Sequence, residues 1–465
     1  MKTVTLVACL AAAQMSLPAA TLSLLPENPH YFLFREKPSV LITSGEHYGA
    51  VLNRDFDQTK YLDTLAADGL NLTRTFTGAY VEPAGAFHIE SNTLAPSDGR
   101  FICPWARSDE SGYAGGGNKF DLMRWDPAYF ERLRNFVALA SERGIVVEVN
   151  LFCPMYDGTQ WKVSPMNPAN NMNHFADLAP NEVYDLKKNG DLQAIQEAMV
   201  RKVVEALADA DNVYYEICNE PYFGGVTMDW QRRIAEVIED AEKAGSVRHL
   251  ISQNVANGTQ KITNPIPQVS IFNFHYANPP TAVAENFALG KVIGENETGF
   301  KGTADDFYRM EAWEFILAGG GLYNNLDYSF TVGHEDGTFQ GSTTQPGGGN
   351  PGFRRQLKTL GDFIRSFDFA RMKPAREVVQ GAIPGDLHLQ VLAEIGKQYA
   401  LYLKGPIPSP LRVDLPAGQY HIEWSDAVSG KPLPAKDVRH PGLIVEIAPP
   451  APQGEFALSI RRTGD

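Results

Sequence analysis

The stretch Asn212–Tyr222 reads NVYYEICNEPY and contains the clearest strand end in the chain. Its apolar run predicts a buried β-strand, and Pro221, which lacks an N–H group, stops the strand ladder there. The side chains of Asn219 and Glu220 are therefore expected at the carboxyl end of this strand. Because aromatic neighbours can raise the pKa of a carboxylic acid enough for it to deliver a proton, Glu220 is a candidate general acid.

Similar apolar runs recur up to about residue 365, and amphipathic stretches lie between them. The runs that predict strands are Val40–Thr43, Leu70–Phe76, Ile145–Phe152, Val213–Cys218, His249–Ser252, Val269–Phe274, Lys291–Asn296 and Gly321–Leu326. The stretches that predict helices include Pro127–Arg143, Leu192–Ala210, Trp230–Ala244 and Ala304–Ala318. Eight buried strands alternating with helices are typical of an α/β fold, the closed parallel (β/α)8 barrel. The alternative, a doubly wound open sheet, is disfavoured because no glycine-rich phosphate loop follows an early strand.

After Pro374 the pattern changes to short alternating runs separated by turn residues. These runs are Leu387–Ala393, Tyr399–Leu403, Leu411–Asp414, Gly418–Trp424, Leu443–Ile447 and Phe456–Arg461. Their spacing predicts a small antiparallel β-sandwich. We therefore expect three parts: a signal peptide at 1–20, a (β/α)8 catalytic barrel at 21–375 and a C-terminal β-sandwich at 376–465.

Residues 1–20 have the pattern of a signal peptide. Lys2 supplies a positive charge, Val4–Ala13 is a short apolar stretch, and small residues follow as far as Ala20. The pattern predicts export and therefore a secreted or periplasmic protein, with a buried N-terminal helix as the alternative interpretation. Since no later segment offers about 18 uninterrupted apolar residues, we expect no membrane span.

Composition excludes several classes of protein. The 465 residues include 41 Lys and Arg against 55 Asp and Glu, which gives a net charge of −14. A nucleic-acid binder normally carries a basic face, so we expect no nucleic-acid partner. Besides Cys9, the cysteines are Cys103, Cys153 and Cys218, and none has the spacing of a zinc site. Cys153 and Cys218 could form one disulfide, although three inert buried thiols are favoured.

A second pair of carboxylates follows in Lys291–Phe300, KVIGENETGF, three strands after Glu220. Strands four and seven of a barrel lie across its mouth from each other, so Glu220 and either Glu295 or Glu297 can face one bond. Two carboxyl groups about 5–5.5 Å apart favour retention, with one acting as nucleophile and the other as acid and then base. Asn219 could donate a hydrogen bond to a sugar 2-hydroxyl in such a site.

These two motifs resemble those of glycoside hydrolase clan A, and of its family 5, the cellulase family, in particular. Asn219-Glu220-Pro221 is similar to the acid/base motif on that clan's fourth strand. The family nucleophile is a glutamate at the end of the seventh strand, in a Glu-x-Gly setting after a run that starts with lysine. Glu297-Thr298-Gly299, six residues after Lys291, is similar to it. The resemblance therefore implies Glu297 as the nucleophile, with Glu295 as the alternative.

Three more residues extend the resemblance. Arg74, in NLTRTF, resembles the clan's arginine that fixes the orientation and charge of the nucleophile, and His275 and Tyr276, in FNFHY, resemble its His/Tyr pair. That pair is commonly separated by one residue, whereas here the two are adjacent. The third strand ends in Asn150–Phe152 instead of the usual histidine, and Tyr323–Tyr328 lacks the usual stacking tryptophan. These departures concern the substrate subsite more than the reaction.

Two long loops, Gly78–Asp121 and Cys153–Asn173, follow strand ends, where barrel enzymes place their sites. Both are rich in aromatic residues, and we expect Trp161 to bind sugar, although ordinary loop packing is the alternative. The sequence thus predicts a retaining β-glycoside hydrolase that acts on a polysaccharide or oligosaccharide by double displacement, with no cofactor and no metal site. A non-catalytic glycan-binding protein on the same fold and a transglycosylase remain as alternatives.

Overall fold

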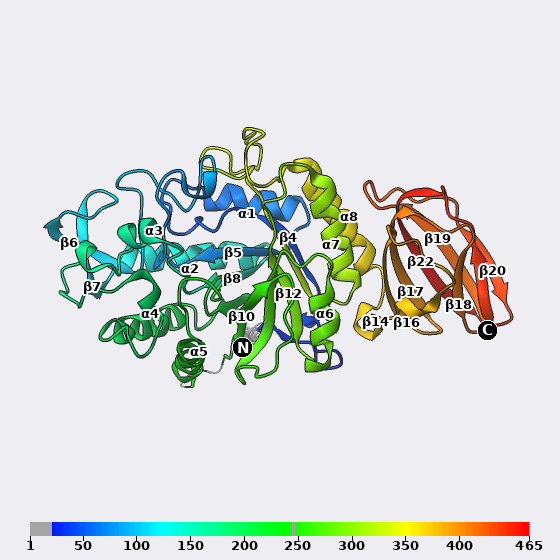
Figure 1. Ribbon diagram of the computed structural model, residues 1–465, viewed down its shortest axis with the longest axis horizontal. Coiled ribbons are helices and arrows are strands. Elements are labelled where there is room, and N and C mark those ends of the chain that lie inside the picture. The colour runs from blue at the N-terminus through cyan, green and yellow to red at the C-terminus, as the bar shows by residue number, and fades with distance from the viewer. Residues whose placement is uncertain (1–20, 244, 246, 465) are drawn as a thin grey trace, which may run out of the picture.

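The computed structural model describes residues 21–243, 245 and 247–464, so the predicted signal peptide at 1–20 lies outside the described residues. Figure 1 shows a barrel of strands and helices beside a smaller all-β unit at the C-terminal end of the chain. Helices α7 (Asp305–Leu317) and α8 (Pro351–Arg365) lie between the barrel strands and that unit. The predicted α/β barrel followed by a β-sandwich is confirmed.

The barrel sheet contains all eight predicted strands, with ends shifted by a few residues. They pair in the order β4 (Leu41–Gly45), β13 (Leu322–Leu326), β12 (Val292–Glu297), β11 (Val269–His275), β10 (Leu250–Asn257), β9 (Val213–Glu216), β8 (Val146–Asn150) and β5 (Leu72–Phe76). Each neighbouring pair in this order is parallel. Asn71 nearly closes the ring, because its side-chain amide donates to Val40 O (2.9 Å) and accepts from Ile42 N (2.8 Å).

Helices follow most of the strands, and local sequence signals set where they begin. They are α1 (Gln58–Ala67), α2 (Pro127–Glu142), α3 (Gly158–Val163), α4 (Leu192–Ala206), α5 (Met228–Glu242), α6 (Thr281–Asn286), α7 and α8. Asp57 and Asp126 accept from N–H groups in the first turns of α1 and α2, which would otherwise lack partners. Prolines at the start of α2 and α8 fit there because no hydrogen bond is lost.

A small antiparallel sheet closes the amino end of the barrel. It consists of β1 (Ser23–Leu24), β2 (Phe32–Phe34) and β3 (Lys37–Ser39). Phe32 and Phe34 pack in one buried cluster with residues from the starts of the barrel strands, such as Leu72 and Val146. Because this end is filled with apolar side chains, polar chemistry is left to the carboxyl end.

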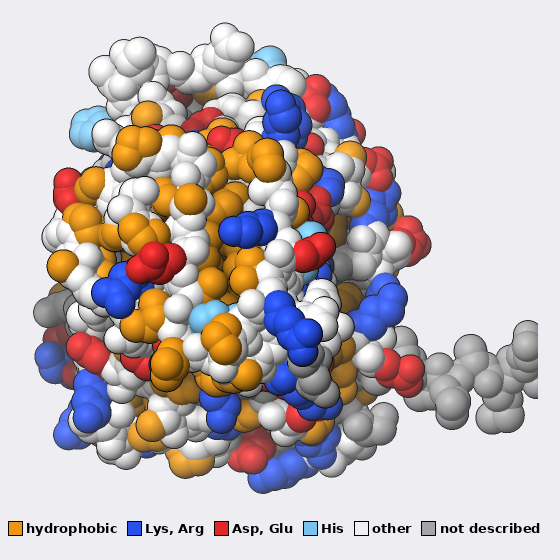
Figure 2. Space-filling model, turned by 90° about the vertical axis from the view of Figure 1, so that its right-hand side faces the viewer, with side chains coloured by type: hydrophobic (Ala, Val, Ile, Leu, Met, Phe, Trp, Pro, Cys, Tyr) orange, Lys and Arg blue, Asp and Glu red, His pale blue; other side chains and the backbone are white. Residues whose placement is uncertain are grey.

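The C-terminal unit is a two-sheet sandwich. One sheet has the order β14 (Lys373–Pro374), β16 (His388–Glu394), β17 (Gln398–Pro406), β22 (Gln453–Gly464), β19 (Gly418–Asp426) and β20 (Lys436–His440), and the other β15 (Val379–Gln380), β18 (Leu411–Leu415) and β21 (Leu443–Ile447). Tyr420 and Trp424 lie in its buried core. The sequence did not predict strand β20, because apolar and polar residues do not alternate in its KDVRH stretch. Seen from this end, hydrophobic side chains lie interspersed with acidic and basic ones (Figure 2).

The sandwich contacts helix α7 through an ion pair and an aromatic stack. Arg309 makes a two-pronged ion pair with Glu455 of β22, at 2.8 and 2.7 Å. One turn further along, Trp313 stacks on Tyr402 of β17 with ring centroids 5.3 Å apart. Bidentate arginine pairs and stacked aromatic rings fix geometry as well as adding attraction, so the two units are held in one orientation.

The two long loops are more ordered than the sequence indicates. Gly78–Asp121 contains β6 (Trp105–Ser111), which forms a hairpin with β7 (Asn118–Trp125), and Cys153–Asn173 contains α3. Cys103, Cys153 and Cys218 are free and buried, so the disulfide alternative is wrong. In the part of the chain that the structure describes, no helix has both the length and the apolar character needed to span a bilayer.

Candidate active site

A cavity of about 520 Å³ opens at the carboxyl end of the barrel. Most of its lining residues lie at or just after the ends of seven strands, from Tyr48 after β4 to Glu297 at the end of β12, and the others, such as Glu82 and Leu94, come from the long loop after β5. The aromatic side chains that line it are Tyr48, Phe76, Tyr80, Phe87, Tyr156, Phe223, Tyr276 and Phe300. Apolar walls with a few polar groups are typical of a small-molecule site.

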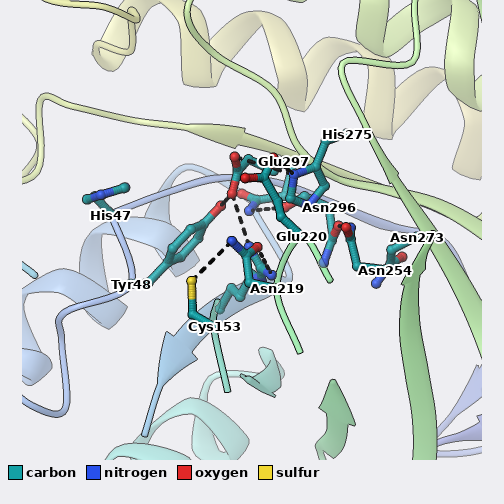
Figure 3. A network of polar contacts seen from close by, with 12 residues as sticks. His47, Tyr48, Cys153, Asn219, Glu220, Asn254, Asn273, His275, Asn296 and Glu297 are labelled. Atoms are coloured by element: carbon teal, nitrogen blue, oxygen red, sulfur yellow. Dashed lines mark hydrogen bonds and ion pairs between the residues drawn. The ribbon is translucent and has the colours of Figure 1, made fainter. Parts of the chain in front are cut away.

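Glu220 and Glu297 meet in this cavity, one from the end of β9 and the other from the end of β12 (Figure 3). A carboxylate oxygen of each and a ring nitrogen of His275 lie within 4.8 Å of one another. His275 Nδ1 is 3.1 Å from Glu220 Oε1 and 3.4 Å from Glu297 Oε1, so one imidazole lies between both carboxylates. Burial alone lowers the pKa of His275, but the charge of Glu297 and its bonds to both carboxylates outweigh burial and raise it to about 9.

Glu297 is surrounded by donors. Its Oε1 accepts from the Tyr276 hydroxyl at 2.7 Å, and its Oε2 accepts from the Tyr48 hydroxyl at 3.0 Å and from Arg74 Nη1 at 3.3 Å. Burial would raise the pKa of this carboxyl, but His275, Arg74 and Tyr276 together hold it well below its usual range. Glu297 is therefore ionised at neutral pH.

Glu220 has a different environment, made mainly of tyrosine. Its Oε2 accepts from the Tyr156 hydroxyl at 2.7 Å, and its Oε1 accepts from the Tyr222 hydroxyl at 3.2 Å. Asn219 Nδ2 also donates to the Tyr156 hydroxyl, at 2.8 Å, and Asn219 Oδ1 accepts from Arg74 at 2.8 Å. Asn219 thus links the surroundings of the two carboxylates.

A buried ionic layer supports the site from within the barrel. Arg74 pairs with Glu148 (2.7 Å) and with Glu216, and Asn296 donates to both of these glutamates, at 2.8 and 2.7 Å. Burial, followed by the repulsion of Glu216, raises the pKa of Glu148 to about 8. The raised pKa reflects the excess of buried carboxylates around the guanidinium of Arg74.

An irregularity in β12 explains how Asn296 and Glu297 both reach the barrel axis. The pairing with β11 shifts there, since Phe274 pairs with Glu295 whereas His275 pairs with Glu297. The extra residue is a β-bulge, which re-aims side chains. Glu295 instead accepts from the Ala277 N–H at 2.7 Å, and burial and Glu311 raise its pKa well above the usual value. Glu295 is not among the described residues that line the cavity, so the geometry favours Glu297 over Glu295 as the nucleophile.

Several lining residues have a strained backbone. Tyr48, Phe87, Glu220, Tyr276 and Phe300 all have φ between 35° and 59°, a left-handed conformation that residues with a side chain rarely adopt. Such strain clusters at functional sites because the surrounding structure must hold it in place.

Comparison with known proteins agrees with this geometry. Residues 46–307 match the family model described as cellulase (glycosyl hydrolase family 5), which is more than half of the chain. The chain belongs to glycoside hydrolase family 5. It is therefore a glycoside hydrolase of clan A, and its substrate is a carbohydrate. No curated protein matches the sequence.

Solved structures resemble the family 5 enzyme over three quarters or more of its length. One, described as a glycoside hydrolase family 5 from Bacteroides vulgatus, has a TM-score of 0.66 at 14% identity and covers 96% of this chain and 95% of its own. Another, described as a glycoside hydrolase, has a TM-score of 0.65 at 14% identity, with 97% and 99% covered. An endo-1,4-beta-mannanase from Rhizomucor miehei has a TM-score of 0.50 at 12% identity, with 75% and 100% covered. At such identities the similarity shows the fold alone.

The structure of the family 5 enzyme brings most of the sequence-predicted site residues together. Glu220, Glu297, Asn219 and Tyr276 line the cavity, and His275 lies directly beneath it. The side chain of Arg74 is fully buried. It contacts Glu297 from inside the barrel and therefore positions this carboxylate. Trp161 of α3 is buried in the main core and is not among the described residues that line the cavity. The expectation that it binds sugar was wrong, because an aromatic residue in a loop can pack inward.

Sequence reasoning missed five residues around the carboxylates: His47, Tyr48, Glu82, Tyr156 and Tyr222. Tyr222 directly follows the Asn-Glu-Pro motif, and Tyr156 lies three residues after Cys153, so closeness to a strand end was the available signal. His47 and Tyr48 follow β4 in the same way, whereas Glu82 lies deep in a long loop and gave no such signal.

Proposed function

We propose that the enzyme is a retaining β-glycoside hydrolase of oligosaccharides or polysaccharides, with Glu297 as nucleophile and Glu220 as acid/base. The observation that carries the proposal is the pair of carboxylates whose oxygens lie within 4.8 Å across one cavity. Retaining enzymes have carboxyl groups about 5–5.5 Å apart, whereas inverting enzymes leave roughly 6.5–9.5 Å for a water molecule. The short separation therefore favours direct attack by one carboxylate.

In the first step Glu297 attacks the anomeric carbon while Glu220 gives its proton to the glycosidic oxygen. The low pKa of Glu297 keeps it ionised for this attack. The C–O bond to the leaving group breaks, its electron pair stays on that oxygen, and a glycosyl ester of Glu297 forms. We expect Asn219, which Arg74 and Tyr156 hold in position, to contact the sugar beside this bond.

In the second step Glu220, now a carboxylate, takes a proton from water, and the water oxygen attacks the same carbon. Glu297 leaves as a carboxylate and recovers its hydrogen bonds from Tyr48 and Tyr276. These donors stabilise the negative charge that develops on the departing oxygen atoms. The proton taken from this water leaves Glu220 protonated for the next cycle, and configuration at the anomeric carbon is retained.

A panel of β-linked polysaccharides and aryl β-glycosides tests the proposal. We expect wild type to hydrolyse at least one, and Glu220→Gln and Glu297→Gln to lose more than 1,000-fold in kcat, roughly the contribution of a catalytic nucleophile or acid. Azide should restore turnover of an activated aryl glycoside in Glu220→Gly, with a glycosyl azide of retained configuration as product. Full activity in both glutamine variants would refute the assignment.

Export of the enzyme is proposed on the charge and apolar pattern of residues 1–20. Mass spectrometry of the mature protein tests it, because cleavage near Ala20 removes about the first twenty residues. Retention of Met1 or Lys2 at the N-terminus of the secreted fraction would contradict this cleavage.

A further inference from the structure

One end of the cavity contains a buried ion pair that the hydrolytic steps do not use. His47 Nε2 lies 3.4 Å from Glu82 Oε2, and both side chains line the cavity together with Glu220 and Glu297. Only 8% of His47 and 5% of Glu82 are exposed. Burial alone lowers the pKa of His47, but Glu82 reverses this effect and raises it. A charged pair taken out of water needs further hydrogen bonds to offset its desolvation.

The pair has hydrogen-bonding capacity left over. The Tyr80 hydroxyl donates to Glu82 Oε1 at 3.0 Å, and Asn92 Nδ2 donates to Oε2. Since a carboxylate offers about four acceptor positions, Oε1 can accept further donors. His47 Nδ1 is buried and has no hydrogen-bond partner among the described residues. The free acceptor positions of Glu82 Oε1, beside the His47 ring, fit a hydroxyl group of a sugar.

The cavity is closed behind this pair and open on the other side. The closed end is built by buried residues, among them Tyr80 (2% exposed) and Leu94 (1%). The open rim carries Phe87, Phe223 and Phe300, which are 37–44% exposed. A sugar chain can therefore enter the closed end only with its terminus.

Hydrogen bonds hold the loop that closes this end in place. The Glu82 N–H donates to Leu94 O at 2.9 Å, which draws the ends of the 82–94 segment together. The Thr93 hydroxyl lies 2.6 Å from Glu46 Oε2 and 2.8 Å from His47 O, so this segment is joined to the one that follows β4. Glu82 and His47 are thus held in one fixed arrangement before any ligand binds.

Within this end, His47 lies on the side of the nucleophile. Tyr48, next to His47, donates to Glu297, whereas the Tyr222 hydroxyl, beside Glu220, lies between Glu220 and Asn257, and Tyr222 is 36% exposed. The sugar bonded to Glu297 therefore faces the His47–Glu82 pair, and the leaving group lies toward the open rim. In a retaining reaction the sugar on the nucleophile is the one on the non-reducing side of the cleaved bond.

We infer that the His47–Glu82 pair binds hydroxyl groups of a terminal, non-reducing sugar, so that the enzyme releases single sugar units from chain ends. This inference rests on the proposed function, and it makes Glu82 and His47 residues that determine specificity. A hydroxyl on a neutral sugar fits the Glu82 carboxylate that His47 holds in place, whereas a continuing chain has no room beyond the pair.

The first test uses wild type and oligosaccharides labelled at the reducing end, drawn from whichever sugar the panel identifies. We expect single sugars from the start, while the labelled chain shortens one unit at a time. A matched set with the terminal 4- and 6-hydroxyls capped by a benzylidene group should be cleaved more than 100-fold more slowly. Internal cleavage of capped chains at the uncapped rate would overturn the inference.

The second test compares Glu82→Gln with Glu90→Gln, a control on the same loop whose carboxylate contacts Ser342 outside the cavity. Glu82→Gln should lose about 10- to 100-fold in kcat/KM, as expected for a lost charged hydrogen bond. On aryl glycosides deoxygenated at the hydroxyl that Glu82 binds, the same variant should lose less than about threefold, since that partner is already absent. Equal losses on both substrates would indicate a merely structural role and overturn the inference.

Failure of this inference and failure of the proposed function are distinguishable. Glu220→Gln run on the same uncapped oligosaccharides reports on the chemistry alone. If Glu220→Gln is inactive while wild type cleaves capped chains internally, the reaction stands and the chain-end inference falls. If Glu220→Gln retains full activity, the proposed catalytic residues are wrong, whatever the cleavage pattern.

Discussion

Replacement of Tyr276 by phenylalanine should slow the second chemical step selectively. Its hydroxyl donates to Glu297 Oε1 at 2.7 Å, the shorter of the two tyrosine bonds to this carboxylate. In the glycosyl-enzyme Glu297 is a neutral ester, so this bond gains strength only as the carboxylate leaves. A hydrogen bond to a charged group contributes about 1.5–3 kcal/mol, which corresponds to about a 10- to 150-fold slower deglycosylation.

The assay is rapid-mixing kinetics with a dinitrophenyl β-glycoside, whose good leaving group makes the first step fast. Tyr276→Phe should release one equivalent of dinitrophenol in a burst and then turn over slowly, with kcat reduced far more than kcat/KM. Tyr323→Phe is the matched control, because its buried hydroxyl bonds to Tyr308 O away from the cavity. Equal falls in kcat and kcat/KM without a burst would refute the reasoning, as would a similar loss in the control.

Three further predictions concern the buried charges and the loop contacts. The folded-state pKa of His275 is about 9 against an ordinary 6.5, so its contribution to stability is full below pH 6.5 and is lost as pH rises through about 9. The decline in the Tm of wild type between these pH values should therefore be smaller in His275→Gln. Equal slopes of Tm against pH in the two proteins would contradict this prediction. Arg74→Met should lower the free energy of unfolding in urea by about 3–5 kcal/mol because it leaves buried carboxylates unpaired, whereas Arg100→Met at the surface should cost less than about 1 kcal/mol. Gly49→Ala would place a Cβ 2.2 Å from Thr93 O and should destabilise the protein by about 1–3 kcal/mol in the same assay, while an unchanged midpoint would show that the loops can separate freely.

The barrel could be predicted because its signal is repeated and local. Each strand of a parallel barrel is buried on both faces and is therefore a mainly apolar run, as in Val146–Asn150 (VVEVN), which is buried throughout although it contains Glu148. Glu220 could be found because Asn219-Glu220-Pro221 closely follows an apolar run, although β9 itself ends at Glu216. The β6–β7 hairpin was missed since its strands, such as Asn118–Trp125, carry many polar residues that are read as loop.

The finer geometry of the site depends on tertiary contacts that the sequence does not display. Choosing between Glu295 and Glu297 required the bulge in β12, because strict alternation would send both residues, which are two positions apart, to the same side of the strand. Glu82 reaches the cavity through a loop closed by bonds to residues far along the chain. The prediction for Trp161 was wrong because it rested on residue type alone, and residue type gives no information on where a side chain points.

The central claim, that Glu297 is the nucleophile, is tested most directly by trapping the intermediate. A 2-deoxy-2-fluoro glycoside of the preferred sugar with a dinitrophenyl leaving group should inactivate the enzyme and add one sugar to its mass, because fluorine slows both steps and the good leaving group preserves the first. Peptide mapping by mass spectrometry should place that sugar on Glu297. A label on Glu295 or Glu220, or turnover with inversion and no labelled peptide, would contradict the account.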